Sequence, residues 1–458
     1  MRKRCSMRQD FLLRSDLAKK LYTKVAADLP IIDYHNHLSV ADIASDRKFE
    51  NITQLWVSVD PYKHRAMRIL GIPERYITGD ASDFEKFEKW YSCLPRLAGN
   101  PLFDWSMMEF NTVFGMEIYP FTRSAKEVWD EVNEKVRELS ALKILTKFNI
   151  EYSAPCASLI EDLSNFDKSK GICPSLRGDD IVGVNKAFVE KLEQVTDKQI
   201  QSLADFEHAI VKRLAAFVEA GCKYSDHALD DGFNYVTDDG KNEERFVKVL
   251  QGAELSEQDK LQLSSRILKT LAGLYAKNGF TMQLHIGAKR STSTRLREVA
   301  GPAGGYAAIG HPVNVKALTA LLDDIEQQEN GLPRTMLFTL NPADNAVMSI
   351  LSGSYSKDGV EAIVSQGPAW WWCDHYQGMV NMLDHLSVFG VASTFVGMTT
   401  DSRSLLSFVR HDYFRRILCN WIGEKVEKGI LPDNEEILSE MIRNMCYYNA
   451  AKTVKGEK

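Results

Sequence analysis

The chain has 458 residues, of which 44% are hydrophobic and 26% charged, a composition typical of a globular protein with a substantial core. Its formal net charge of -6 argues against nucleic acid or an anionic membrane as the main partner, and no run of residues is apolar enough to span a bilayer. An anionic substrate would therefore need a local basic pocket.

The eight cysteines are widely scattered and form no CxxC pair. A disulfide framework or a structural zinc knuckle is therefore not expected. The first 22 residues mix charged residues and leucine without a continuous apolar stretch, so we expect no signal peptide. These features favour the cytoplasm, where thiols stay reduced.

Strands alternate with helices along most of the chain. The predicted strands are 30–34, 150–154, 172–176, 222–226, 280–286, 335–340, 362–366 and 394–398. Amphipathic helices are predicted at 201–220, 257–278, 313–326, 343–351, 376–389 and 404–421. This alternation indicates a parallel sheet, and eight strands suggest a closed, distorted (β/α)8 barrel, although a doubly wound open sheet would produce the same pattern.

A long, mostly helical stretch, residues 38–149, separates the first two predicted strands. It contains Trp56, Trp90, Trp105 and Trp129. We interpret it as a helical insertion on the active-site side of a single barrel domain that spans residues 1–458, rather than as a separate domain.

In a barrel enzyme the chemistry lies where the strands end, so we take the residues after each strand in turn. His35 and His37 follow the first strand. Imidazoles at positions i and i+2 of an extended segment point the same way and can reach one cation. Two surface histidines would give the same pattern, but the apolar residues just upstream place this pair at the mouth of a buried strand.

The middle strands end in further polar residues. Arg177 follows the third strand, and Asp226 and His227 end the fourth, where only one of the two should face the barrel axis. His285 ends the fifth strand and Arg290 follows it. A histidine within an apolar strand is more often a structural residue, but Gly287 just beyond it favours a site.

The last two strands are followed by aromatic and charged residues. Trp370 begins a run of three tryptophans after the seventh strand, and at least one of them should form a pocket wall. Asp401 and Arg403 follow the eighth strand. Asp401 can complete a metal site or act as a base; it could instead cap the next helix, but Ser402 can supply that cap.

The inventory of strand ends contains no lysine that could be carboxylated to bridge two metals, so one divalent ion is the simpler expectation. Arginines cannot deprotonate and form paired hydrogen bonds with carboxylates. The sequence therefore predicts a single-metal site with an anionic substrate.

On these residues the chain resembles uronate isomerase, a divergent branch of the amidohydrolase superfamily. The resemblance covers residues 30–451, and its distinctive segments are 33–38, 49–56, 62–67, 76–81, 282–288, 395–403 and 410–418. The chain departs from the family pattern at Pro368-Ala369, at Trp372, where phenylalanine is usual, and at Ala154-Pro155-Cys156, where strand two usually ends in threonine and aspartate.

The resemblance implies roles for individual residues. His35, His37 and Asp401 would surround the metal, usually zinc in this family. Asp401 would be the base with Arg403 beside it, and Tyr62 a proton-transfer group from the insertion. The rest of the substrate pocket would be formed by Arg177, Asp226, His285, Arg290 and Trp370, with His285 a further candidate for catalysis.

The expected reaction is an aldose–ketose isomerisation of D-glucuronate to D-fructuronate and of D-galacturonate to D-tagaturonate. An arginine among Arg177, Arg290 and Arg403 would bind the C6 carboxylate, and the expected assembly is a homo-oligomer. Two alternatives remain at this point: a metal-dependent hydrolase of the same superfamily, in which metal-bound water attacks an ester or amide, and a non-catalytic sugar-acid-binding protein.

Overall fold

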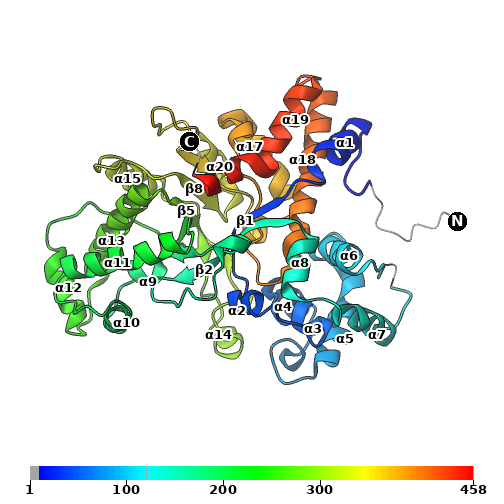
Figure 1. Ribbon diagram of the computed structural model, residues 1–458, viewed down its shortest axis with the longest axis horizontal. Coiled ribbons are helices and arrows are strands. Elements are labelled where there is room, and N and C mark those ends of the chain that lie inside the picture. Colours follow the sequence, from blue (N-terminus) through cyan, green and yellow to red (C-terminus); the bar gives the residue numbers. More distant parts are fainter. Residues whose placement is uncertain (1–9, 120, 457–458) are drawn as a thin grey trace.

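The computed structural model describes residues 10–119 and 121–456. Its centre is a curled parallel sheet whose neighbours follow the order β1-β2-β3-β4-β5-β8-β9 (Figure 1). These strands are β1 Ile31–Asn36, β2 Ile150–Ser158, β3 Ser175–Arg177, β4 Tyr224–Leu229, β5 Thr281–Ile286, β8 Thr335–Thr339 and β9 Val364–Gln366. The seven-stranded α/β sheet confirms the first seven predicted strands. A short antiparallel ribbon, β6 Ala288–Lys289 and β7 Ala308–Ile309, follows β5.

Helices surround this sheet, and none in the described part of the chain is long and apolar enough to cross a membrane. Before β2 they are α1 Asp16–Leu21, α2 Val40–Ala44, α3 Ile52–Trp56, α4 Pro61–Ile69, α5 Asp83–Cys93, α6 Pro101–Phe114, α7 Ala125–Val136 and α8 Ala141–Lys147. Between β3 and β8 they are α9 Asp179–Val182, α10 Lys186–Thr196, α11 Leu203–Glu219, α12 Asn242–Leu250, α13 Glu257–Asn278, α14 Thr294–Ala300 and α15 Val315–Glu326. The last are α16 Asn345–Leu351, α17 Tyr376–Phe389, α18 Val409–Glu427, α19 Glu435–Arg443 and α20 Asn449–Lys455.

The eighth predicted strand, residues 394–398, is wrong. The chain forms a 3-10 turn at Ala392–Thr394 and then an irregular segment. Gly397 has φ +103°, outside the extended region, and a Cβ there would lie 2.9 Å from the Met445 carbonyl oxygen. The backbone carbonyls of this segment accept hydrogen bonds from side chains: the Asn449 amide donates to Phe395 (2.9 Å) and the Tyr34 hydroxyl to Gly397 (2.7 Å). Residues 394–398 therefore lie beside β1 but do not form the backbone hydrogen bonds of a β-strand.

Two layers of side chains fill the inside of the curled sheet. Tyr152, Tyr224 and Phe338 belong to a buried inner cluster. Because side chains alternate along a strand, Asp226, two residues after Tyr224, points to the same face nearer the carboxyl end of the sheet. The tyrosines thus form a packed floor, and polar residues lie above it.

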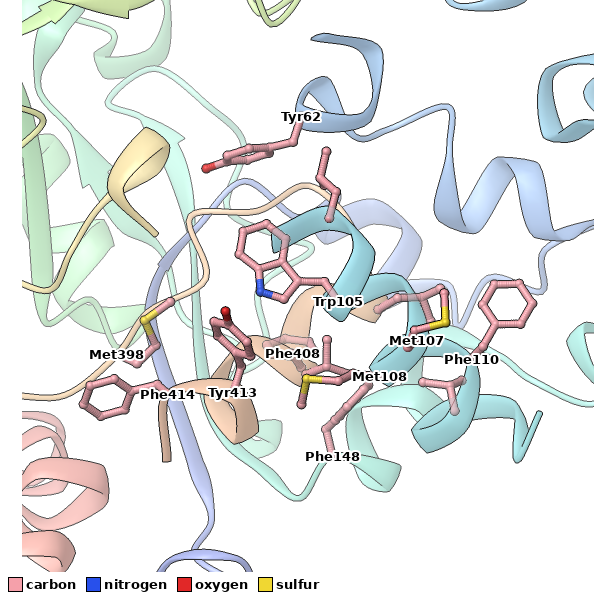
Figure 2. Close-up of a cluster of buried hydrophobic side chains, with 14 of the residues drawn as sticks. Tyr62, Trp105, Met107, Met108, Phe110, Phe148, Met398, Phe408, Tyr413 and Phe414 are labelled. Carbon is pink, nitrogen blue, oxygen red and sulfur yellow. The ribbon is translucent and has the colours of Figure 1, made fainter. Parts of the chain in front are cut away.

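The helices between β1 and β2 lie together on one side of the sheet, opposite α9 to α13 (Figure 1). Met107, Met108 and Phe110 of α6 belong to the buried cluster of this group, and the centre of the Trp105 ring of α6 lies 6.2 Å from that of Tyr413 in α18 (Figure 2). Tyr62 lies at the end of this cluster beside Trp105 (Figure 2). Tyr62 directs its hydroxyl out of the cluster (Figure 2). The helical group therefore holds Tyr62 over the sheet.

Candidate active site

A cavity of ≈270 Å³ opens at the carboxyl ends of the strands. Its volume lies just below the range of about 300–1,000 Å³ typical of pockets for drug-sized ligands, so it suits a smaller molecule. All ten site residues predicted from the sequence line it: His35, His37, Tyr62, Arg177, Asp226, His285, Arg290, Trp370, Asp401 and Arg403. The sequence therefore located the cavity, whereas the roles of these residues stay predictions.

Asp33 fixes the segment after residue 398 to strand β1. Its fully buried carboxylate accepts hydrogen bonds from the backbone N–H (2.6 Å) and the hydroxyl (2.7 Å) of Thr400 and from the Asn36 amide (2.9 Å), and lies 3.2 Å from His411 Nε2. Burial would raise the pKa of Asp33, but His411 and Thr400 lower it, so the carboxylate is ionised. The Asp401 N–H also donates to the His35 carbonyl (3.1 Å).

Asp401 has φ +47°, a left-handed conformation that costs a non-glycine residue free energy. This conformation turns its carboxylate to the two histidines: Oδ1 is 3.1 Å from Nε2 of both His35 and His37. Oδ2 accepts a hydrogen bond from the Trp370 indole (2.9 Å). Burial opposes ionisation, but the two histidines hold the pKa of Asp401 well below its usual value. The group is therefore a carboxylate at neutral pH.

Strand β2 brings Cys156 to the same cluster, which the sequence analysis did not anticipate. Its Sγ lies 3.6 Å from His35 Nδ1 and 3.4 Å from Asp226 Oδ1. The sequence signal was the departure from the family pattern at this position, but strand two was expected to end at residue 154. The strand continues through Pro155, which has no N–H, and pairs with β3 from Cys156 onward.

At the end of β4, Asp226 is the residue that faces the cavity. His227 points to the opposite side, where its Nε2 lies 3.0 Å from the Tyr275 hydroxyl. Gly178 makes room for this ring, because a Cβ there would lie 2.0 Å from His227 Cε1. The sequence could not decide whether Asp226 or His227 faces the site. In the structure the residue that does so is Asp226.

His285 lies between other rings, with its ring centroid 4.4 Å from that of His35 and 4.7 Å from that of Trp370. Its Nε2 is buried and has no hydrogen-bond partner in the described part of the chain. Burial, followed by the charge of His35, holds the pKa of His285 well below its usual value. The ring is thus a neutral imidazole with one free nitrogen in the cavity wall.

Tyr62 reaches the cavity from the first turn of α4. Asp60 caps this helix by accepting the Tyr62 N–H (2.9 Å), and Pro61 occupies the first helical position. Burial raises the pKa of Tyr62 well above its usual value, so the phenol is neutral, and its hydroxyl has no hydrogen-bond partner among the described residues. The Arg410 guanidinium lies 4.8 Å from the centre of the Tyr62 ring.

Arg410 is a second residue that the sequence analysis did not assign to the site. It is 1% exposed, and its Nη1 donates to the Thr400 carbonyl (3.1 Å) and contacts Asp374 Oδ2 (3.3 Å). It therefore touches both the Tyr62 ring and the segment that contains Asp401. Its only sequence signal was membership of the family-like segment 410–418.

The three cavity arginines differ in their partners. Arg177 Nε donates to Asp179 (2.9 Å), and Arg290 Nε donates to both oxygens of Asp230 (2.8 and 2.9 Å). Arg403 is exposed and has no carboxylate partner within the residues the structure describes. Arg403 is thus the cavity arginine without a carboxylate contact among the described residues, whereas Arg177 and Arg290 each have Nε bonded to an aspartate.

The cluster at β1 has the donor chemistry of a divalent metal site. One ligand atom from each of His35, His37 and Cys156 lies within 4.8 Å of the others, and the Asp401 carboxylate contacts both rings. Imidazole, thiolate and carboxylate are the ligands that Zn²⁺ and similar ions take in proteins. These residues fit a single metal ion.

Comparisons with known proteins agree with this architecture. The glucuronate isomerase family model matches residues 4–453. A uronate isomerase of Caldicellulosiruptor bescii is 40% identical, over 97% of this chain and 98% of its own length, and one of Clostridium perfringens is 37% identical, over 98% and 99%. The crystal structure of the Thermotoga maritima uronate isomerase superposes with a TM-score of 0.89 at 28% identity, over 98% of this chain and 99% of that one. A full-length family match and relatives of this similarity place the chain in the glucuronate isomerase family.

Proposed function

We propose that this protein is a uronate isomerase that interconverts D-glucuronate with D-fructuronate and D-galacturonate with D-tagaturonate. The observation that supports this most directly is one small cavity lined by Asp401, Tyr62 and Arg403. They supply an ionised carboxylate, a neutral phenol and a guanidinium with no carboxylate partner among residues 10–119 and 121–456. An aldose–ketose isomerase needs a base, an acid and a site for the substrate anion.

Binding comes first. Arg403 pairs with the C6 carboxylate, because Arg177 and Arg290 are already bonded to Asp179 and Asp230. The sugar then lies between the β1 end of the cavity and the Trp370 wall, with the hydroxyls within reach of Asp226 and His285.

Proton transfer follows. The Asp401 carboxylate removes the C2 proton of the aldehyde form, exchanges it with solvent in part of the turnovers, and delivers a proton to C1. Tyr62, a neutral phenol, donates its proton to O1 as the enediol forms and takes up the O2 proton. The His285 Nε2 position can hydrogen-bond the oxygen on which charge develops, and a preorganised donor in a buried site is worth far more than one in water.

The proposal includes one divalent ion, which His35 and His37 would hold with Asp401 beside them. The ion is expected to be zinc, because these are ligand atoms that zinc prefers. When bound, the ion would act as a Lewis acid on the substrate oxygens. The proposal also includes a distorted (β/α)8 barrel in which residues 395–400 take the place of an eighth strand, with residues 38–149 as a helical insertion in a single domain.

The deciding experiment is incubation of the purified protein with each uronate in D₂O, with NMR detection of the ketose. We expect ketose and deuterium at the exchanged carbon. Hydrolysis of an ester or amide without any ketose would favour the hydrolase alternative, and tight uronate binding without turnover would favour a binding protein.

A further inference from the structure

We propose that Cys156 is a thiolate ligand of the divalent ion in this active site, bound together with His35 and His37. This inference depends on the proposed function only through the presence of that ion. It adds a ligand that neither the sequence pattern nor the family resemblance assigned.

The first argument is distance. In a tetrahedral zinc site with Zn–S of about 2.3 Å and Zn–N of about 2.0–2.1 Å, the sulfur and nitrogen ligand atoms are about 3.5 Å apart. Cys156 Sγ lies 3.6 Å from His35 Nδ1. A ligand atom of His37 completes a group whose members are all within 4.8 Å of one another, so small side-chain rotations suffice to surround one ion.

The second argument is the partner of the other His35 nitrogen. Metal-binding histidines almost always donate their second ring N–H to a carboxylate or carbonyl, which fixes the ring. His35 Nε2 lies 3.1 Å from Asp401 Oδ1. With the ion on the Nδ1 side of the ring, Asp401 orients His35 through this hydrogen bond and its carboxylate remains available as the base.

The third argument concerns the unpaired donor nearby. His285 Nε2 is buried in the cavity wall without a partner among the described residues, and its ring lies against that of His35. Leaving a buried polar atom unpaired costs free energy, so this nitrogen points to a ligand in the cavity. The cavity wall beside His35 therefore has a polar atom that is unsatisfied among the described residues, as expected where a ligand binds.

Ion binding at Cys156 has a defined proton balance. The thiol S–H, which now donates to Asp226, is replaced by a sulfur–metal bond, and the proton leaves to solvent. Asp226 Oδ1 loses its donor and becomes free to accept a hydroxyl of the sugar. The proposed ligand therefore links ion binding to the preparation of the substrate pocket.

The test uses the full-length protein loaded with Co²⁺, with Cys156→Ser and Cys156→Ala compared against Cys173→Ser. Cys173 is a buried thiol outside the cavity, so its variant controls for loss of any cysteine. The parent and Cys173→Ser should show a near-ultraviolet sulfur-to-cobalt charge-transfer band that both Cys156 variants lack. Zinc affinity, measured by competition with a chelator, should fall by at least about tenfold, and binding should release about one proton fewer.

A parent protein that binds Co²⁺ without this band, or that binds no divalent ion, would overturn the proposal. So would Cys156 variants whose zinc affinity equals that of the parent. Uronate turnover by the parent is measured separately: if it is absent while the band is present, the proposed function fails and the thiolate ligand stands.

Discussion

Arg403 offers a sharp test of how the cavity recognises its substrate. It is the cavity arginine without a carboxylate partner in the described part of the chain, so replacing it leaves no protein carboxylate unpaired. We expect Arg403→Gln to lose one charge-assisted hydrogen bond to the C6 carboxylate. Such hydrogen bonds are worth about 1.5–3 kcal/mol. Because Arg403 is exposed, we take the lower part of this range, about 2 kcal/mol. This loss corresponds to roughly a 30-fold fall in kcat/KM for D-glucuronate.

The assay compares initial rates with D-glucuronate and with its C6 amide, which lacks the negative charge. Arg403→Gln should reduce turnover of the acid and leave that of the amide nearly unchanged. Arg295→Gln is the matched control, because Arg295 is an exposed arginine that does not line the cavity and has no carboxylate partner in the described part of the chain. If Arg403→Gln lowered both substrates equally, or lowered neither, another group would bind the carboxylate and the reasoning from ion-pair partners would be refuted.

Three further predictions follow from the site and its surroundings. Asp401→Asn should lower isomerisation and C2 proton exchange with D₂O by roughly 10²–10⁴-fold while metal content, measured on the same sample, persists; exchange at the parent rate would identify another base. The His35→Ala, His37→Ala double variant should lose its ion in elemental analysis, and full occupancy would move the metal site elsewhere. Burial raises the pKa of Asp104 from 3.8 to about 6, so its stabilising effect is present below pH 3.8 and is lost as the pH rises through 6. Urea denaturation should therefore show Asp104→Asn to be more stable than the parent by about 1–3 kcal/mol at pH 8 but not at pH 4; an equal difference at both values would contradict this explanation.

The cavity could be located from the sequence because strand periodicity and strand-end chemistry are local properties. Apolar runs bounded by helices placed His35, Asp226 and His285 at carboxyl ends of parallel strands, and those ends must meet on one side of the sheet. The structure adds what depends on partners distant in sequence. Arg177 and Arg290 are bonded to aspartates, whereas Arg403 has no such partner among the residues that the structure describes, and spacing alone could not predict this difference.

Cys156 was missed for a related reason. The second strand was predicted to end at residue 154, just before Pro155, and proline is unfavourable inside a sheet. In the structure β2 changes partner at this point: it pairs with β1 up to Pro155 and with β3 from Cys156, so the missing N–H falls where the two ladders meet. The strand continues and takes Cys156 to His35.

The irregular segment in place of the eighth strand explains how Asp401 reaches the histidines. An extended strand through this point would not provide the left-handed backbone of Asp401, which costs about 1–3 kcal/mol in a non-glycine residue. The two hydrogen bonds that Asp33 accepts from the Thr400 N–H and hydroxyl are buried and charge-assisted, each worth about 1.5–3 kcal/mol, so together they offset that strain. The position of the candidate base is therefore set by Asp33, a residue that does not line the cavity.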